Sequence, residues 1–133
     1  MLKISYKYDL IPTTEQVIHL YEDAGLNRPT TDAERIRKMY IHANLIITAW
    51  HQGELIGVAR SLTDFCYSCY LADLAVMKKY QKHGIGKMLV ELTKEKIGKQ
   101  SMLHLHAAPT AMEYYPKIGM LKAENSFMIR RLE

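Results

Sequence analysis

The residues with the clearest chemical character lie at 81–87, where the sequence is Gln-Lys-His-Gly-Ile-Gly-Lys. An amphipathic helical pattern begins within this stretch, with apolar residues at i, i+3, i+4 and i+7: Ile85, Met88, Leu89 and Leu92. The first turn of a helix has backbone N–H groups without partners and the positive end of the helix dipole, so it binds anions such as phosphates. Glycine lets the backbone approach such a ligand closely. Together with Lys82, His83 and Lys87, this stretch predicts a phosphate-rich ligand at the start of the helix.

Two nucleotide-binding motifs and a nucleic-acid-binding surface fit this stretch less well. The P-loop pattern G-x-x-x-x-G-K-[ST] is absent, and Leu89 stands where a dinucleotide fingerprint would have its third glycine. The net charge of +4 is compatible with a polyanion, but only Tyr80 is interleaved with the cations of this region. Taken alone, the G-x-G pattern also fits a solvated loop before a good helix start.

A longer string of residues narrows the choice. Residues 74–76, Leu-Ala-Val, are followed after four residues by 81–86, Gln-Lys-His-Gly-Ile-Gly, and this resembles the acyl-CoA-binding motif of the GNAT superfamily of N-acyltransferases. That motif is Q/R-x-x-G-x-G/A after a strand that ends in an apolar triplet. Residues 111–120, Ala-Met-Glu-Tyr-Tyr-Pro-Lys-Ile-Gly-Met, resemble the family's A-x-x-F-Y-x-K-x-G-F helix. The order of the expected elements also agrees over nearly the whole chain.

The resemblance implies a role for each part. Backbone N–H groups of residues 81–86 would hold the CoA pyrophosphate, and the strand at 74–76 would pair with the pantetheine arm and polarise the thioester carbonyl. Tyr115 matches the tyrosine that protonates the departing thiolate, and a phenol with a pKa near 10 suits that task. The residues expected to bind acetyl-CoA are Leu74, Ala75, Val76, Gln81, Lys82, His83, Gly84, Ile85, Gly86 and Lys87.

Two residues depart from the family pattern near this helix. Ala108 stands where the family often has an asparagine that contacts the cofactor. Pro116 directly follows Tyr115, and a proline ring inside a helix clashes with the preceding turn.

Several other polar residues have both a chemical and a structural explanation. The reaction needs an acceptor for the amine proton, and the candidates are Asp73, Asp64 or a chain of waters; either carboxylate could equally be structural. His104 and His106 share one face of an expected strand, but no third metal ligand is apparent, so no metal is expected. The two cysteines fit ordinary free thiols better than a functional pair.

The elements that position these residues are expected to form one α/β domain over residues 1–133, with a mixed central sheet flanked by helices. The resemblance implies that this is a GNAT-type acyl-CoA N-acyltransferase fold. The expected helices cover 14–24, 33–40, 85–97 and 109–118. The expected strands begin at Ile4 and cover 45–50, 55–62, 66–76 and 102–107, and two short strands close the chain near 120–121 and 127–130. The unit from 71 to 107 should be a right-handed parallel crossover.

The function that these features imply is transfer of an acetyl group from acetyl-CoA to a primary amine of a small molecule, amino acid or peptide. The alternative is a non-catalytic CoA-binding sensor of the same fold, which would not need Tyr115. The acceptor would lie between residues 26–29 and 122–126. We expect a cytoplasmic protein with no nucleic-acid or membrane partner, since no apolar run approaches ~20 residues, and a homodimer is one option.

Overall fold

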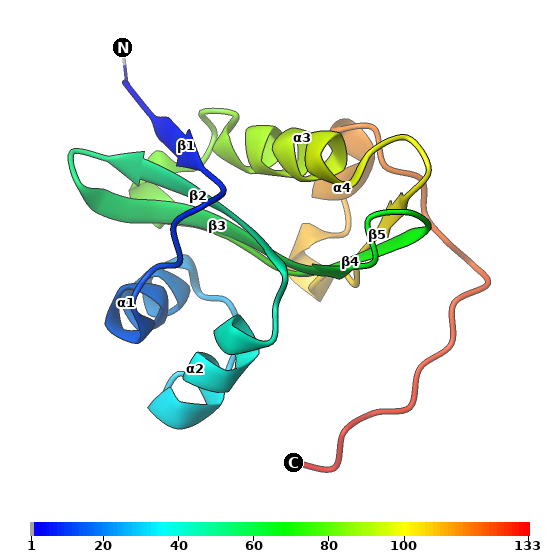
Figure 1. The fold of residues 1–133 in the computed structure, drawn as a ribbon, viewed down its shortest axis with the longest axis horizontal. Coiled ribbons are helices and arrows are strands. Elements are labelled where there is room, and N and C mark those ends of the chain that lie inside the picture. The colour runs from blue at the N-terminus through cyan, green and yellow to red at the C-terminus, as the bar shows by residue number, and fades with distance from the viewer. Residues whose placement is uncertain (1) are drawn as a thin grey trace.

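The protein is described by a computed structural model that covers residues 2–133. Its centre is a five-stranded sheet in the order β1 (Ser5–Lys7), β2 (Leu45–His51), β3 (Glu54–Thr63), β4 (Ser68–Val76) and β5 (Met102–His104) (Figure 1). The first four strands are antiparallel neighbours, whereas β5 runs parallel to β4. The sheet is therefore mixed, as the sequence predicts.

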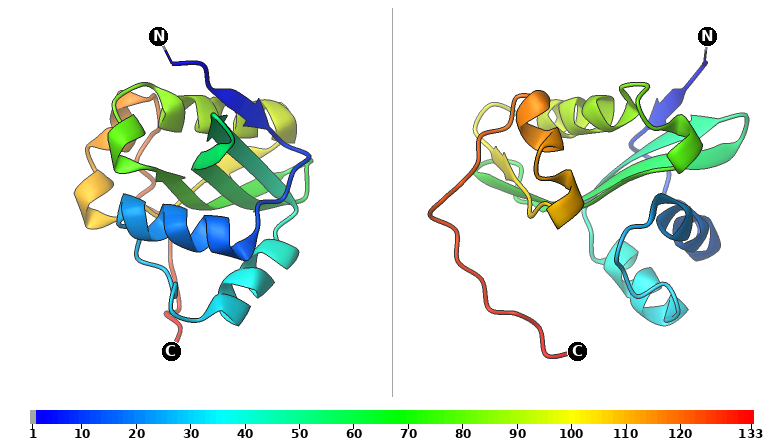
Figure 2. Two further views of the ribbon diagram at one scale, coloured as in Figure 1. Left: turned by 90° about the vertical axis from the view of Figure 1, so that its left-hand side faces the viewer. Right: turned by 180° about the vertical axis from the view of Figure 1, so that it is seen from behind.

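Helices cover both faces of the sheet. Helices α1 (Thr14–Ala24) and α2 (Ala33–Ile41) lie on one face, and α3 (Ile85–Ile97) and α4 (Tyr114–Lys117) lie on the other (Figures 1 and 2). The start of α1 is fixed by a capping box, because the Thr13 hydroxyl accepts from the Gln16 N–H and the Gln16 side chain accepts from the Thr13 N–H. Gly25 ends the helix in the left-handed conformation.

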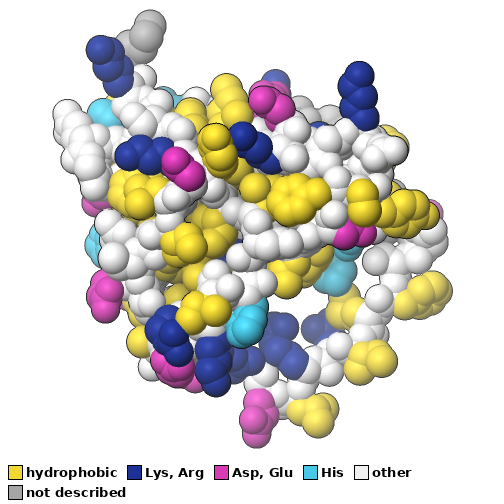
Figure 3. All heavy atoms as spheres, viewed as in Figure 1, with side chains coloured by type: hydrophobic (Ala, Val, Ile, Leu, Met, Phe, Trp, Pro, Cys, Tyr) yellow, Lys and Arg dark blue, Asp and Glu magenta, His cyan; other side chains and the backbone are white. Residues whose placement is uncertain are grey.

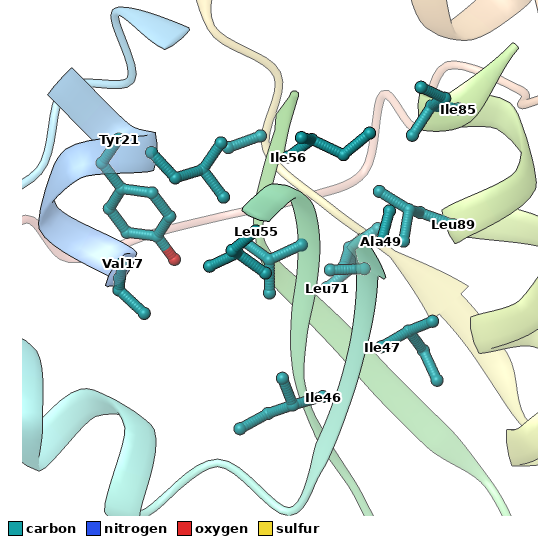
Figure 4. Packing of buried hydrophobic residues seen from close by; sticks show 14 of the residues in the cluster. Val17, Tyr21, Ile46, Ile47, Ala49, Leu55, Ile56, Leu71, Ile85 and Leu89 are labelled. Carbon is teal, nitrogen blue, oxygen red and sulfur yellow. The ribbon is translucent and has the colours of Figure 1, made fainter. Parts of the chain in front are cut away.

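The hydrophobic core lies on both sides of the two central strands. Figure 4 shows Val17 and Tyr21 from α1 on one side of β2 and β3, and Ile85 and Leu89 from α3 on the other. A strand buried on both faces needs a nearly continuous apolar sequence, and β2 has one, Leu-Ile-Ile-Thr-Ala-Trp. This packing holds the start of α3 at a fixed place above the end of β4.

The C-terminal third of the chain differs from the sequence-based expectation. The expected helix at 109–118 is a 3-10 turn at Pro109–Ala111 followed by α4, which begins only at Tyr114. Pro116 explains the late start, because its ring is tolerated in a first turn but clashes with the carbonyl four residues earlier. Strand β5 ends at His104, and the two closing strands expected near 120–121 and 127–130 are absent from the described chain. The predictions of these two strands were therefore wrong.

The helices of residues 2–133 are all too short or too polar to cross a lipid bilayer.

Candidate active site

Strand β4 has one edge that is paired throughout and one that is not. Its first edge pairs with β3 from Cys69 to Val76, whereas its second edge pairs with β5 only over residues 68–70. Within residues 2–133, no strand pairs with the second edge over 71–76. Backbone N–H and C=O groups need partners, so this part of β4 can bind an extended ligand as a strand would. The predicted residues 74–76 lie in this open stretch.

The loop that leaves β4 has two residues with an uncommon backbone conformation. Lys82 and Gly84 both adopt left-handed conformations, with φ angles of 67° and 77°. A turn with such residues can direct successive N–H groups toward a common point, which makes an anion-binding concavity. The side-chain amide of Gln81 donates to the carbonyl of Val76 at 2.9 Å and ties the loop to the end of β4. A left-handed lysine is strained, and such strain is concentrated at ligand-binding sites.

The N-terminus of α3 offers its backbone groups to the same space. Gly84 is its N-cap residue, and among the described residues no side chain caps the helix. The first N–H groups of a helix have no intrahelical partner, so here they remain free for a ligand. The Ile85 side chain is buried in the core, which fixes the helix, whereas Lys82 and Lys87 are exposed beside its start.

The two tyrosines of α4 occupy different places. Tyr114 lies against the start of α3: a Cβ atom added to Gly86 would stand 2.5 Å from the Tyr114 hydroxyl. The Tyr115 ring stands edge-on to that of Tyr114, with centroids 5.2 Å apart, and is half-buried. Burial, together with the neighbouring Tyr114, raises the pKa of Tyr115, and the positive charge of Arg28 opposes that rise. Tyr115 is therefore protonated at neutral pH, as a proton donor must be.

Asp73 is at the centre of a buried polar network. Its carboxylate accepts hydrogen bonds from Nε of Arg28, from Nε of Arg60 at 2.7 Å and from the Tyr21 hydroxyl at 2.7 Å. The Tyr21 hydroxyl also lies 2.6 Å from that of Tyr40. Burial alone would raise the pKa of Asp73, but Arg60 and Arg28 outweigh it and hold that pKa below its usual value. These contacts favour the structural explanation of Asp73 over its role as a base.

Arg28 is the residue of this region to which the sequence assigned no role. Besides Asp73, its guanidinium donates to the backbone carbonyls of Asn27 and, at 2.8 Å, of Ala72. Ala72 is an extra residue in β4, because the register with β3 passes from Asp73 opposite Arg60 to Leu71 opposite Ser61. Arg28 thus holds the predicted acceptor loop against the bulge of β4. The signal that could have indicated this role of Arg28 is the cross-strand pair of Arg60 and Asp73. A carboxylate that binds one buried arginine can also accept a hydrogen bond from a second.

The other candidate residues, Asp64, His104 and His106, contact groups of the protein itself. The Asp64 carboxylate accepts three backbone N–H groups, from Cys66, Tyr67 and Ser68, which lower its pKa to about 2 and hold the turn before β4. His104 and His106 are exposed, and their rings lie near that of Tyr70, with centroids 5.4 and 5.6 Å from its centroid.

The two cysteines differ in exposure. Cys69 is buried on β4, whereas Cys66 is exposed in the preceding turn and both are free thiols. Residues 2–133 bring together no group of three histidine, cysteine or acidic side chains that could hold a metal ion.

An open β4 edge that leads into an uncapped helix start is the arrangement that the GNAT resemblance implies. The family model of the acetyltransferase (GNAT) domain matches residues 15–130. The chain belongs to the GNAT acetyltransferase family. The mixed sheet and its helices are accordingly a GNAT fold.

Known GNAT-related proteins agree with this assignment. A Bacillus subtilis (strain 168) protein named as a candidate acetyltransferase is 31% identical over 85 residues, which are 62% of this chain and 57% of the relative. The match thus spans little more than half of that protein. A structure from meticillin-resistant Staphylococcus aureus, described as of unknown function and a probable acetyltransferase, is 26% identical. It superposes with a TM-score of 0.82 over 97% of this chain and 100% of its own.

A more distant structural neighbour contains a ligand. An aminoglycoside N-acetyltransferase in complex with CoA is 13% identical and superposes with a TM-score of 0.73, over 99% of this chain and 97% of its own. At this identity the likeness concerns the fold.

Proposed function

We propose that this chain transfers an acetyl group from acetyl-CoA to a primary amine of a small molecule, an amino acid or a peptide. One observation carries the proposal: the open edge of β4 at residues 74–76 continues through the left-handed loop into the uncapped start of α3. Such a continuous backbone surface suits a ligand with an amide-rich arm and a diphosphate. Membership of the GNAT family supports the same function.

The residues around this surface fit acetyl-CoA, which supplies the acetyl group as a thioester. The N–H groups of residues 81–86 would hold the pyrophosphate, and the exposed Lys82, His83 and Lys87 would add positive charge beside it. The open edge at 74–76 would pair with the pantetheine arm, and one of its N–H groups would donate to the thioester carbonyl. Tyr114 would line the same loop, because its hydroxyl lies against Gly86.

The chemistry that we propose uses Tyr115 as the proton donor. As the new N–C bond forms and the C–S bond breaks, Tyr115 gives its proton to the departing sulfur. The raised pKa of Tyr115 keeps this proton in place until the thiolate forms. The proton lost by the amine goes to water in this scheme. The role of Asp73 as its acceptor stays a prediction, but the paired carboxylate is better suited to position Arg28 and the bulge of β4.

The test is an amine panel with acetyl-CoA, including aminoglycosides and peptide amines, in which release of free thiol is followed. Once an acceptor is found, Tyr115→Phe should lower kcat by about 10²–10⁴-fold and leave the amine KM nearly unchanged. Tyr114→Phe is the matched control, because it removes the neighbouring hydroxyl from the same helix and should keep most of kcat. Full activity of Tyr115→Phe at saturating acetyl-CoA would remove Tyr115 from the mechanism. CoA binding without turnover on any amine would favour the sensor function instead.

A further inference from the structure

Two arginines share one carboxylate in the network at Asp73. Arg28 and Arg60 each form an ion pair with Asp73, and among residues 2–133 neither arginine pairs with a second acidic side chain. The other hydrogen-bonded members, Tyr21 and Tyr40, are uncharged at neutral pH, because burial raises the pKa of both hydroxyls. The network therefore holds one positive charge more than its single carboxylate balances.

Arg28 is the charged member of this network that a ligand can reach. The side chain of Arg60 is only 10% exposed and lies on β3 directly opposite Asp73, whereas that of Arg28 is 28% exposed and comes from the loop between α1 and α2. A guanidinium has five N–H groups, and three of those of Arg28 donate, to Asp73, Asn27 and Ala72. One N–H on each terminal nitrogen has no acceptor within residues 2–133, so Arg28 can still bind an anion.

Arg28 lies close to the proposed reaction centre. Its charge acts on Tyr115, the proposed proton donor, since it opposes the rise in the pKa of that hydroxyl. Its hydrogen bond to the Ala72 carbonyl holds it at the open stretch of β4. The proposed pyrophosphate site is instead at the start of α3, the helix that covers the other face of the sheet (Figures 1 and 2). The phosphates of CoA are therefore not the counter-charge of Arg28.

The surface on this side of the molecule is rich in basic side chains. In Figure 3, Lys and Arg side chains gather beside the hollow between the body of the molecule and the C-terminal segment, residues 120–133. Helix α2 and the end of the segment meet here, because Arg35 donates to the Glu133 carbonyl at 3.2 Å. Such a surface attracts anionic small molecules, and Arg28 gives them a specific partner.

We propose that Arg28 binds a carboxylate of the acceptor, so that the acceptor is an amino acid with a free carboxylate next to its amine. This inference rests on the proposed acetyl transfer. The two N–H groups of Arg28 without a protein acceptor can donate to carboxylate oxygens, which a guanidinium matches in charge and shape. A carboxylate held there balances the excess charge of the network and brings the neighbouring amine toward Tyr115. A lysine side chain within a peptide has no such carboxylate and would bind weakly.

The first experiment compares paired acceptors on the wild-type protein. Each common amino acid is tested against its amide, which keeps the amine and the side chain but lacks the carboxylate, at saturating acetyl-CoA with thiol release as the signal. For the amino acids that are acetylated, kcat/KM should exceed that of the amide by about 10–100-fold, the range expected for hydrogen bonds to a charged group. Amides that are acetylated as well as the amino acids would overturn the role of Arg28 but leave acetyl transfer standing.

The second experiment locates the preference at Arg28. In Arg28→Gln the ratio of kcat/KM for an amino acid to that for its amide should fall close to one, whatever loss the two acceptors share. Arg28→Lys keeps the charge and should keep part of the preference. Arg35→Gln is the matched control, because it removes an exposed arginine from α2 and should leave the ratio unchanged. A ratio in Arg28→Gln equal to that of the wild type would show a purely structural role and overturn the proposal.

The third experiment measures binding without turnover. The complex of the protein with CoA is titrated by calorimetry with N-acetyl amino acids, the expected products, and with their amides. The carboxylates should bind about 10–100-fold more tightly than the amides in the wild type and in Arg35→Gln, but not in Arg28→Gln. This preference without turnover of any amine would contradict the transfer function and support the carboxylate site. Equal binding of both series, or binding of neither, would overturn the site.

Discussion

Two neighbouring regions of the molecule differ in whether their polar groups have hydrogen-bond partners within the chain. The first is Asp73 within β4, and the second is the loop that follows this strand. At Asp73 the carboxylate oxygens accept hydrogen bonds from two arginines and a tyrosine. At residues 81–86 the first N–H groups of α3 receive no side-chain cap from the described chain. The first region therefore contributes to the stability of the fold, whereas the second keeps its binding capacity for a ligand. Substitutions in the two regions should accordingly affect different measurements.

The largest effect is expected at Asp73, where the polar groups are hydrogen-bonded within the chain. Asp73→Asn should lower the free energy of unfolding by about 3–5 kcal/mol, because Arg60 stays buried without its counter-charge. Urea unfolding followed by the fluorescence of the single, buried Trp50 measures this loss. Glu34→Gln is the control, since it breaks an exposed ion pair with Arg37 and should change little. An unfolding free energy in Asp73→Asn equal to that of the wild type would contradict the network's structural role.

Acid should weaken the same network. The folded pKa of Asp73 lies below its unfolded value of about 3.9, so its contribution is present above pH ~4 and is lost as pH falls through the folded pKa. Asp64, with a pKa lowered to about 2, adds a loss in the same direction between pH ~4 and 2. Unfolding free energies from pH 6 to 2 should therefore fall more steeply in the wild type than in Asp73→Asn or Asp64→Asn. Parallel curves for all three proteins would count against these assignments.

The network at Asp73 also shows which contacts could not be predicted from the sequence. The strands and the loop at 81–86 have local patterns of apolar spacing and glycine, so the sequence could indicate them. The contact between Arg28 and Asp73 joins residues 45 positions apart in the sequence, and no local pattern encodes it. Asp73 therefore had two explanations in the sequence, and its long-range partners favour the structural one.

The C-terminal segment failed as a prediction for a different reason. Residues 127–130 have a strand-like sequence, but a strand needs a partner, and in the described chain these residues pair with no other strand. The expectation of one domain over residues 1–133 remains a prediction. The site roles of Tyr115 and the loop also remain predictions, because they concern binding and catalysis, which the fold alone does not test.

At the uncapped start of α3, Gly84→Asp should weaken CoA binding by about 10–100-fold, or roughly 1.4–2.8 kcal/mol. The added carboxylate repels the pyrophosphate at the helix start, and Gly84 has a φ of 77° that a side chain adopts with strain. Gly25→Asp is a matched control, because Gly25 has a φ of 73° and equally open space but caps α1 on the other face. Titration calorimetry compares the folded variants. Equal CoA affinity in the two variants would show that strain, not position, determines the result.

The smallest effect tests the contact between α4 and the loop. Gly86→Ala places a methyl group 2.5 Å from the Tyr114 hydroxyl, so the ring must shift, and we expect CoA affinity to fall about fivefold, or roughly 1 kcal/mol. Tyr114→Phe removes that hydroxyl, and the next ring atom, Cζ, lies 3.5 Å from the added Cβ, an ordinary contact distance. The double variant Gly86→Ala/Tyr114→Phe should therefore bind CoA nearly as well as Tyr114→Phe alone. Residues in contact couple in this way, whereas distant ones add independently. If the two losses simply add, the methyl group acts on the ligand directly, and Gly86 is needed for close backbone approach rather than for Tyr114.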